Sequence, residues 1–348
     1  MISAPAAAPA ATLMPAEWER HAATWLAWPH NPRDWPGRFA PIPWVYAEII
    51  RRVSAGETVR LLVGDAALEA KARRTLTRAG VSLERIEFHR IPTDRIWTRD
   101  SGPIFVRRGG ARAIARFRFN AWAKYPDYKK DTRIPERAAR VLGLPLLEVG
   151  GAILEGGAID VNGKGSILVT EECLLDPAVQ VRNAGYSRAD YEALFKVHLG
   201  ARNTLWLGRG IAGDDTHGHI DDLARFVSPR TIVLCAEKDP QDANYPALNE
   251  NRERLQSARL EDGSRPEVVL LPMPQPIVFA GQRLPASYAN FYLCNAAVLV
   301  PVFDDPGDRI ALGILGDLFR DRPVIGIGAR DLVWGLGTLH CLSQQEPA

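Results

Sequence analysis

Residues 155–170 read EGGAIDVNGKGSILVT, which is an acid, a short apolar run, an Asn-Gly turn and a second apolar run. Two runs rich in β-branched and apolar residues on either side of such a turn predict a β-hairpin. The acid, Glu155, stands immediately ahead of the first predicted strand. A chemically reactive residue followed by a hairpin is therefore the pattern to seek in the rest of the chain.

The same order recurs at four other places, without sequence identity between them. Asp100 precedes the predicted strands GPIFV and ARAIARF, and His219 precedes IDDLARFV and TIVLCA. Asn290 lies near the start of a further pair, SYANFYLC and VLVPVF. Cys341 lies in TLHCL close to the C-terminus, where no second run follows. Four of the five modules thus begin at a residue that suits catalysis.

The stretches between the modules leave room for a helix and a further strand, and residues 188–200 and 246–258 are candidate helices. We therefore predict an α/β fold in which five modules form a five-fold pseudo-symmetric propeller. The run TWLAWP at residues 24–29 is expected to pair with the last module and close the ring, since closure removes exposed sheet edges. A radial array of this kind would bring the starts of equivalent strands together near one axis.

The 348 residues contain no linker rich in serine, glycine or charge, so we expect a single domain over residues 13–348. Residues 1–12 are rich in alanine and proline and lack the basic start of a signal peptide, so we expect a disordered tail there. Hydrophobic residues make up 46% and charged residues 24% of the chain, a balance that excludes a largely disordered protein.

The charge balance argues against two classes of partner. Lys and Arg number 43 and Asp and Glu 41, so the formal net charge is only +2, whereas nucleic-acid binders are usually more basic. No apolar run reaches the ~18–20 residues of a membrane span. We expect neither a nucleic-acid nor a membrane partner. The four sparse cysteines make neither a disulfide framework nor a CxxC site, which favours a reduced, cytoplasmic enzyme. The oligomeric state stays open, with a homo-oligomer as one possibility.

Cys341 is a candidate nucleophile because the glycines of GIGARDLVWGLG, at residues 326–337, allow the backbone to approach a ligand. A small buried hydrophobic residue is the alternative for a lone cysteine. Upstream, His219 and Asp221 are two residues apart and would share one face of a strand. Proton transfer by His219 is the favoured interpretation. A metal site made by His217, His219 and Asp221 is a second possibility, and a hydrogen-bonded structural histidine is a third.

The carboxylates Asp100, Glu155 and Asp221 adjoin apolar segments, where an unpaired charge is costly. Together they would repel one another unless a cation lies among them, and we expect that cation to be the substrate. A guanidinium presents five donors in a flat fork, which carboxylates can accept bidentately. Trp97 would either cover the face of the guanidinium by a cation–π contact or pack in the core.

These residues lie in motifs that resemble the agmatine deiminase and bacterial-type peptidylarginine deiminase family of the guanidine-modifying pentein superfamily. The resemblance covers nearly the whole chain, from MPAEWERHAATWLAWPHNPRDWPG at residues 14–37 to the terminal HCLSQQEP. Between these ends lie WTRDSGP (97–103), FRFNAW (117–122), LEGGAID (154–160), GHIDDLARF (218–226), LPASYANFYLCNAAVLVPVFDDP (284–306) and GLGTLHC (335–341).

The resemblance implies the five-fold propeller, and it implies hydrolysis of a small cationic guanidine to a ureido compound with loss of ammonia. No metal or organic cofactor would be needed. Cys341 would be the nucleophile and His219 the general acid and base. Asp100 and Asp221 would hold the guanidinium, and Glu155 would orient the histidine and the pocket. The default substrate of the family is agmatine, which gives N-carbamoylputrescine.

One position departs from the family pattern. Ahead of the catalytic acid, agmatine deiminases have a sequence similar to TDDSW, whereas this chain has TDRIW at residues 93–97. Asp94 is kept, and Arg95 replaces an acid. We expect Asp94, Arg95 and Asn290 to contact the substrate. Because an arginine side chain can bind a carboxylate bidentately, arginine or peptidyl-arginine is the alternative to agmatine.

Overall fold

The four complete hairpins expected from the sequence are present in the computed structural model, which describes residues 11–348. All four pairs are antiparallel: β5 (Ile104–Arg108) with β6 (Ala111–Arg118), β8 (Asp160–Val161) with β9 (Ser166–Thr170), β11 (Ala224–Phe226) with β12 (Thr231–Ala236), and β16 (Tyr292–Cys294) with β17 (Ala297–Val302).

The turn between β8 and β9 shows why these short runs form hairpins. The Asn162 side-chain oxygen accepts hydrogen bonds from the backbone N–H groups of Lys164, Gly165 and Ser166 at 2.9–3.1 Å. Gly163 and Gly165 have φ values of 67° and 120°, which residues with a side chain rarely adopt. The Asn-Gly sequence therefore fixes the turn locally.

A third strand extends each hairpin in parallel, and a parallel pair requires a crossover connection, usually a helix. The candidate helices at residues 188–200 and 246–258 are confirmed as two of these connections. The connecting helices and third strands are α4 (Ile134–Leu142) and β7 (Leu146–Ile153), α6 (Arg188–His198) and β10 (Asn203–Leu207), α7 (Tyr245–Ser257) and β13 (Glu267–Pro272), and α8 (Pro306–Leu318) and β18 (Val324–Gly328).

The two ends of the chain share one sheet. The strand β19 (Gln344–Pro347), which follows Cys341, pairs antiparallel with β2 (His21–Ala27), with Gln344 opposite Trp25. The expected pairing of TWLAWP with the last module is thereby confirmed. β2 continues in parallel to β3 (Thr58–Val63) and β3 to β4 (Ile86–Arg90), through helices α1 (Ile42–Ser54) and α2 (Ala66–Arg78).

The expected tail over residues 1–12 lies almost entirely outside the described residues. Its last residue, Thr12, is part of a strand, because β1 (Thr12–Leu13) pairs with β5. The remaining elements are short: α3 (Thr98–Ser101), α5 (Glu171–Leu175) and the pair β14 (Val278–Phe279) and β15 (Gln282–Arg283).

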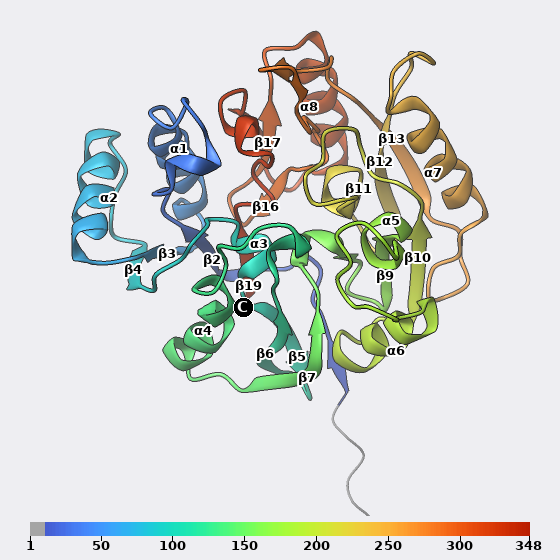
Figure 1. The fold of residues 1–348 in the computed structure, drawn as a ribbon, viewed down its shortest axis with the longest axis horizontal. Coiled ribbons are helices and arrows are strands. Elements are labelled where there is room, and N and C mark those ends of the chain that lie inside the picture. The colour runs from blue at the N-terminus through green and yellow to red at the C-terminus, as the bar shows by residue number, and fades with distance from the viewer. Residues whose placement is uncertain (1–10) are drawn as a thin grey trace, which may run out of the picture.

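The fold is mixed α/β. Figure 1 shows the longer helices around the outside of the molecule and α3 and β19 near its middle. The larger apolar cluster runs from Trp25, in β2, to Leu342, just ahead of β19, so segments near both ends of the chain pack in one core. Over residues 11–348 the strands form six separate sheets and no closed one, so the five-fold propeller stays a prediction. No helix in this part of the chain combines the length and apolar character needed to cross a bilayer.

Candidate active site

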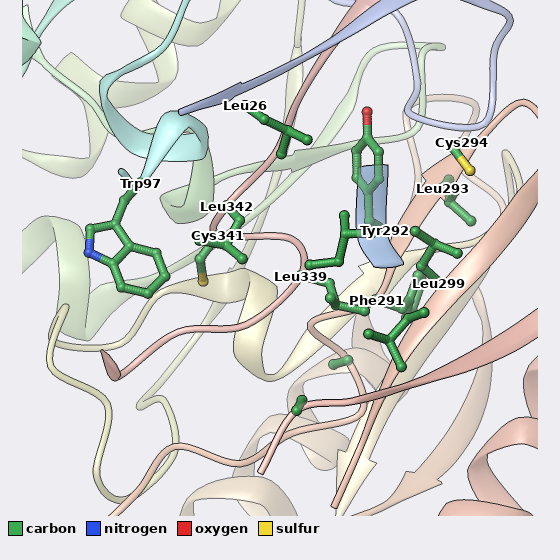
Figure 2. Packing of buried hydrophobic residues seen from close by; sticks show 14 of the residues in the cluster. Leu26, Trp97, Phe291, Tyr292, Leu293, Cys294, Leu299, Leu339, Cys341 and Leu342 are labelled. Carbon is green, nitrogen blue, oxygen red and sulfur yellow. The ribbon is translucent and has the colours of Figure 1, made fainter. Parts of the chain in front are cut away.

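A cavity of about 430 Å³ opens beside Cys341. The most buried part of its lining consists of Trp122, Trp97, Asp100 and Cys341, each 4–6% exposed. Figure 2 shows the Trp97 ring next to Cys341, on the side away from the apolar side chains around Phe291 and Leu299. Trp97 also packs on Trp35, with ring centroids 5.7 Å apart. Trp97 therefore packs in the core and also lines the cavity, and its cation–π contact with a guanidinium stays a prediction.

Gly337 allows the chain to bring Cys341 against the Trp97 ring. A Cβ atom at position 337 would lie 2.7 Å from the indole and 3.1 Å from the Cys341 Cβ, closer than side chains tolerate. This glycine is part of the run that made Cys341 a candidate. Gly337 therefore allows a close approach to Trp97, and the expected approach of the backbone to a ligand stays a prediction.

The Cys341 sulfur contacts two polar side chains. The Asn290 amide nitrogen donates to Sγ at 3.1 Å, and the thiol donates to Asp221 Oδ2 at 3.6 Å. The Asn290 oxygen accepts from Thr338 Oγ1 at 2.7 Å and from the His340 N–H at 3.0 Å. Asn290, expected to contact substrate, thus lies against the sulfur and ties it to the loop that carries it.

The surroundings of Cys341 disfavour its thiolate. Burial raises the pKa of the thiol well above its ordinary value, and the carboxylates of Asp221, Asp222 and Asp100 raise it further. From the sequence, Glu155 was expected in this acidic group. The structure corrects it, because the third acid acting on the sulfur is Asp222.

His219 and Asp221 reach the site by a different local geometry from the one expected. They were expected on one face of a strand, but residues Ile220–Asp222 form a 3₁₀ turn and β11 begins only at Ala224. The turn still directs both side chains inward, since both are at most 1% exposed. His219 Nδ1 lies 3.8 Å from Asp100 Oδ1.

The protonation of His219 follows from its neighbours. Burial works against the imidazolium, but the Asp100 carboxylate, followed by Cys173 and Asp221, outweighs burial and raises the pKa of His219 well above its ordinary value. Neither ring nitrogen has a hydrogen-bond partner among the residues described. The neighbours of His219 therefore favour its imidazolium form, and the buried ring lies beside Asp100, which lines the cavity.

The Asp100 carboxylate, which lies beside His219, is positioned by two hydrogen bonds. Its Oδ2 accepts from Trp122 Nε1 at 2.9 Å, and its Oδ1 accepts from the Gly157 N–H at 3.0 Å. Residues Ala121–Ala123 adopt left-handed φ values of 51–57°, which costs free energy and sets the position of Trp122. Burial raises the pKa of Asp100 to about 6, although the nearby His219 works in the opposite direction.

Glu155 lies one step back from the cavity. Its Oε1 accepts from Arg182 Nε at 3.0 Å, and its Oε2 has no partner among the described residues. Potential ligand atoms of Glu155, Cys173 and His219 all lie within 4.8 Å of one another. Glu155 therefore lies near the histidine without a hydrogen bond or ion pair to it, and it pairs with Arg182 instead, so its orienting role stays a prediction. Cys173 was not anticipated here.

The metal triad considered at the sequence level is not assembled. His217 Nε2 instead pairs with Asp176 Oδ2 at 2.9 Å, and its Nδ1 lies 3.9 Å from Glu172. Within residues 11–348, the two clusters of possible metal ligands contain His219 and Asp221 separately, and neither contains His217.

Asp94 and Arg95 separate in the structure. Asp94 turns away from the cavity lining and binds Lys130, through Nζ at 3.1 Å and the backbone N–H at 2.9 Å. The expectation that Asp94 contacts substrate is therefore not supported by its position. Arg95 does line the cavity, beside Asp34, Asp127 and Tyr125.

Besides Cys173 and Asp222, two further residues near the site, His340 and Glu17, were not expected from the sequence. His340, the neighbour of Cys341, bridges Asp221 Oδ2 through Nδ1 and Glu17 Oε2 through Nε2, each at 2.7 Å. Glu17 also pairs with Arg225 at 3.0 Å and Arg99 at 3.1 Å. Only the position of His340 next to the candidate nucleophile offered a signal, because the partners are far apart in the sequence.

This network makes Glu17 important for stability. Burial works against its charged form, but Arg225, His340 and Arg99 outweigh burial and hold the pKa of Glu17 well below its ordinary value. Replacing Glu17 with glutamine leaves buried cations uncompensated and is expected to lower the free energy of unfolding by about 3–5 kcal/mol at neutral pH, measured by urea denaturation. The contribution is present above the ordinary pKa of glutamate and is lost as the pH falls towards the lowered value.

Glu19 supplies a matched control for Glu17. It pairs with Arg107 at 2.9 Å, with both side chains about one-third exposed. The Glu19→Gln variant is expected to lose less than about 1 kcal/mol. Equal losses from the two variants would show that the buried network adds nothing special.

Comparison with known proteins gives a consistent result. A model of the Porphyromonas-type peptidyl-arginine deiminase family matches residues 13–347. A protein of Selenomonas ruminantium, provisionally named an agmatine deiminase, is 39% identical over 96% of this chain and 95% of its own length. The agmatine deiminase of Ectopseudomonas mendocina is 33% identical over 96% of this chain and 95% of its own length. The structure of an Enterococcus faecalis agmatine deiminase superimposes with a TM-score of 0.90 at 26% identity, covering 98% of both chains.

Proposed function

The chain belongs to the Porphyromonas-type peptidyl-arginine deiminase family, and on that basis we propose that it hydrolyses agmatine to N-carbamoylputrescine and ammonia. The observation that carries the proposal is the position of the Cys341 thiol. It shares a cavity with Asp100 and Trp97 and lies 3.6 Å from Asp221. A flat cation fits this combination of acids, aromatic face and nucleophile.

Substrate binding supplies the missing positive charge. The guanidinium lies between Asp100 and Asp221, and Asp221 Oδ1 has no other partner among the described residues. Its charge offsets the acids that hold the thiol neutral, so the thiol loses its proton to solvent as the substrate binds. Charge-assisted bonds to the two carboxylates orient the central carbon over the sulfur.

The first chemical step forms a bond between the Cys341 sulfur and the guanidinium carbon. The tetrahedral adduct collapses when the carbon–nitrogen bond to a terminal nitrogen breaks. His219, protonated beforehand, gives its proton to that nitrogen, and ammonia leaves. The remaining group is a thiouronium bound to the sulfur.

The second step consumes one water. Neutral His219 takes a proton from the water as its oxygen attacks the thiouronium carbon. The carbon–sulfur bond then breaks and the proton of the added hydroxyl passes to solvent, which restores the thiolate and releases the neutral ureido group. Glu155 and Asp100 keep the histidine oriented through both steps, and Asn290 stabilises the sulfur anion by its 3.1 Å hydrogen bond.

The five-fold propeller is part of the same proposal. Four sheets repeat the order of an antiparallel pair followed by a parallel third strand, and β19, β2 and β3 repeat it a fifth time across the two chain ends. This repetition supports a pseudo-symmetric arrangement in which the residues that follow or precede equivalent strands meet at the cavity. A cytoplasmic location and the absence of a nucleic-acid or membrane partner stay predictions.

The proposal is tested by incubating the purified protein with agmatine, arginine and an arginyl peptide, and by measuring ammonia and the ureido product for each. Release of both products in equal amounts from agmatine supports the proposal. Release from arginine or the peptide alone would assign the chain to the alternative substrate class. Binding without release of ammonia would contradict enzymatic function.

A further inference from the structure

The cavity lining contains an arginine, Arg95, whose charge is paired with two carboxylates. Arg95 donates from Nη1 to Asp34 Oδ1 at 2.9 Å and from Nη2 to Asp127 Oδ1 at 2.8 Å. Its guanidinium carbon lies 4.0 Å from the centroid of the Tyr125 ring. The two carboxylates and the aromatic ring together hold Arg95 as part of the wall. A substrate carboxylate would have to compete with both acids for it.

Asp34 has an oxygen to spare. Its side chain is 1% exposed and lines the cavity, yet Oδ2 accepts from no donor among residues 11–348. Burial raises the pKa of Asp34 to about 7. The nearby Asp127 carboxylate also raises it, whereas Arg95 works in the opposite direction. A carboxylate left so poorly compensated gains from any further cation that enters the cavity.

Asp127, on the same arginine, differs from Asp34. Its Oδ1 binds Arg95, and its Oδ2 lies 3.4 Å from Arg33, so both oxygens have cationic partners. Asp215 also lines the cavity and accepts from the Tyr125 hydroxyl at 2.6 Å. Asp215 also pairs with Lys124 at 2.5 Å. The cavity lining as a whole, Asp100 included, therefore has four acids against two arginines and this lysine, which favours a cation there over an anion.

We propose that Asp34 Oδ2 binds a primary ammonium at the far end of the substrate chain, and that this contact selects guanidines with a cationic tail over those with a carboxylate. The inference rests on the proposed function, since the guanidinium end must bind at Cys341. Arg95 acts as a positioning residue, which holds Asp34 in the wall. The earlier expectation that Arg95 reads a substrate carboxylate is replaced by this assignment.

The test compares agmatine with pentylguanidine, in which a methyl group replaces the ammonium, and with arginine. The kcat/KM ratio of agmatine to pentylguanidine is expected to fall by about ten- to a hundredfold in the Asp34→Asn variant, the effect of losing one charge-assisted bond. The change should lie mainly in KM, because the tail takes no part in the chemistry. Turnover of pentylguanidine shows that the variant is folded.

The matched control is Asp127→Asn, which disturbs the same arginine but removes no unpartnered oxygen. Its ratio should stay within about threefold of the wild-type ratio, since its carboxylate is already satisfied. An unchanged ratio in Asp34→Asn would overturn the proposal. A wild-type enzyme that prefers arginine to agmatine, and loses this preference in the Arg95→Gln variant, would also overturn it. That second outcome would assign the tail site to Arg95 Nε, which also lacks a partner in the described part of the chain.

Failure of the proposed function would be visible separately, as no ammonia from any substrate in the wild type. In that case, calorimetry gives the Kd values of agmatine and pentylguanidine, and the ratio of these two Kd values is compared between the wild type and the Asp34→Asn and Asp127→Asn variants. A loss of agmatine affinity confined to Asp34→Asn would still support the ammonium site, and equal affinities in all three proteins would contradict it.

Discussion

Replacing Cys341 with alanine is expected to lower kcat for agmatine by about 10⁴-fold or more, because it removes the atom that bonds to the guanidinium carbon. The binding of agmatine should persist, since Asp100 and Asp221 remain. Ammonia release measures the first effect and calorimetry the second. Intact-protein mass spectrometry of the wild type during turnover should also show the amidino adduct, which the variant cannot form.

Cys294 provides the control for this substitution. It is fully buried in β16, where its thiol donates to the Ala297 carbonyl at 3.2 Å, and it has no contact with the cavity. Cys294→Ala is expected to cost stability and leave turnover near that of the wild type. If Cys341→Ala kept an activity within tenfold of the wild type, Cys341 would not be the nucleophile.

Replacing His219 with glutamine is expected to lower kcat by about 10²–10⁴-fold, the usual contribution of a positioned general acid and base. The variant keeps a polar side chain of similar length but cannot give a proton to the departing ammonia. The loss should appear in kcat more than in KM, since His219 acts on the reacting atoms. Steady-state ammonia release over a range of agmatine concentrations measures both.

His217→Gln is the matched control, because this histidine is two residues away and pairs with Asp176 instead. Its kcat should stay within about threefold of wild type. The metal alternative makes the opposite forecast: loss of activity in His217→Gln, sensitivity to chelators and tolerance of Cys341→Ala. A chelator that abolishes activity in the wild type would therefore favour that alternative.

Local sequence signals were enough to predict the hairpins. The Asn-Gly turn after Val161 depends on contacts within a few residues, and it formed as expected. The position of His219 was predicted for the wrong reason. Period-two spacing suggested a strand, but a 3₁₀ turn places the side chain inward as well, so spacing alone could not separate the two geometries.

The polar network around the sulfur could not be predicted. Glu17 and His340 are more than three hundred positions apart and meet only because β19 pairs with β2. The pairing of Arg95 with Asp34 and Asp127 could not be predicted either. Because of it, we propose that Arg95 holds Asp34 in place and does not bind a substrate carboxylate. A charged residue near a site indicates a ligand only when the structure shows that its partners leave it free.

The central claim is that the substrate supplies the positive charge that Cys341 needs. It is tested most directly by the pH dependence of iodoacetamide alkylation in the substrate-free enzyme, with Cys341→Ser correcting for the other cysteines. The account expects the thiol to titrate above the ordinary value of a cysteine, as its buried acidic surroundings require. A Cys341 thiol that titrates below neutrality in the empty site would contradict it.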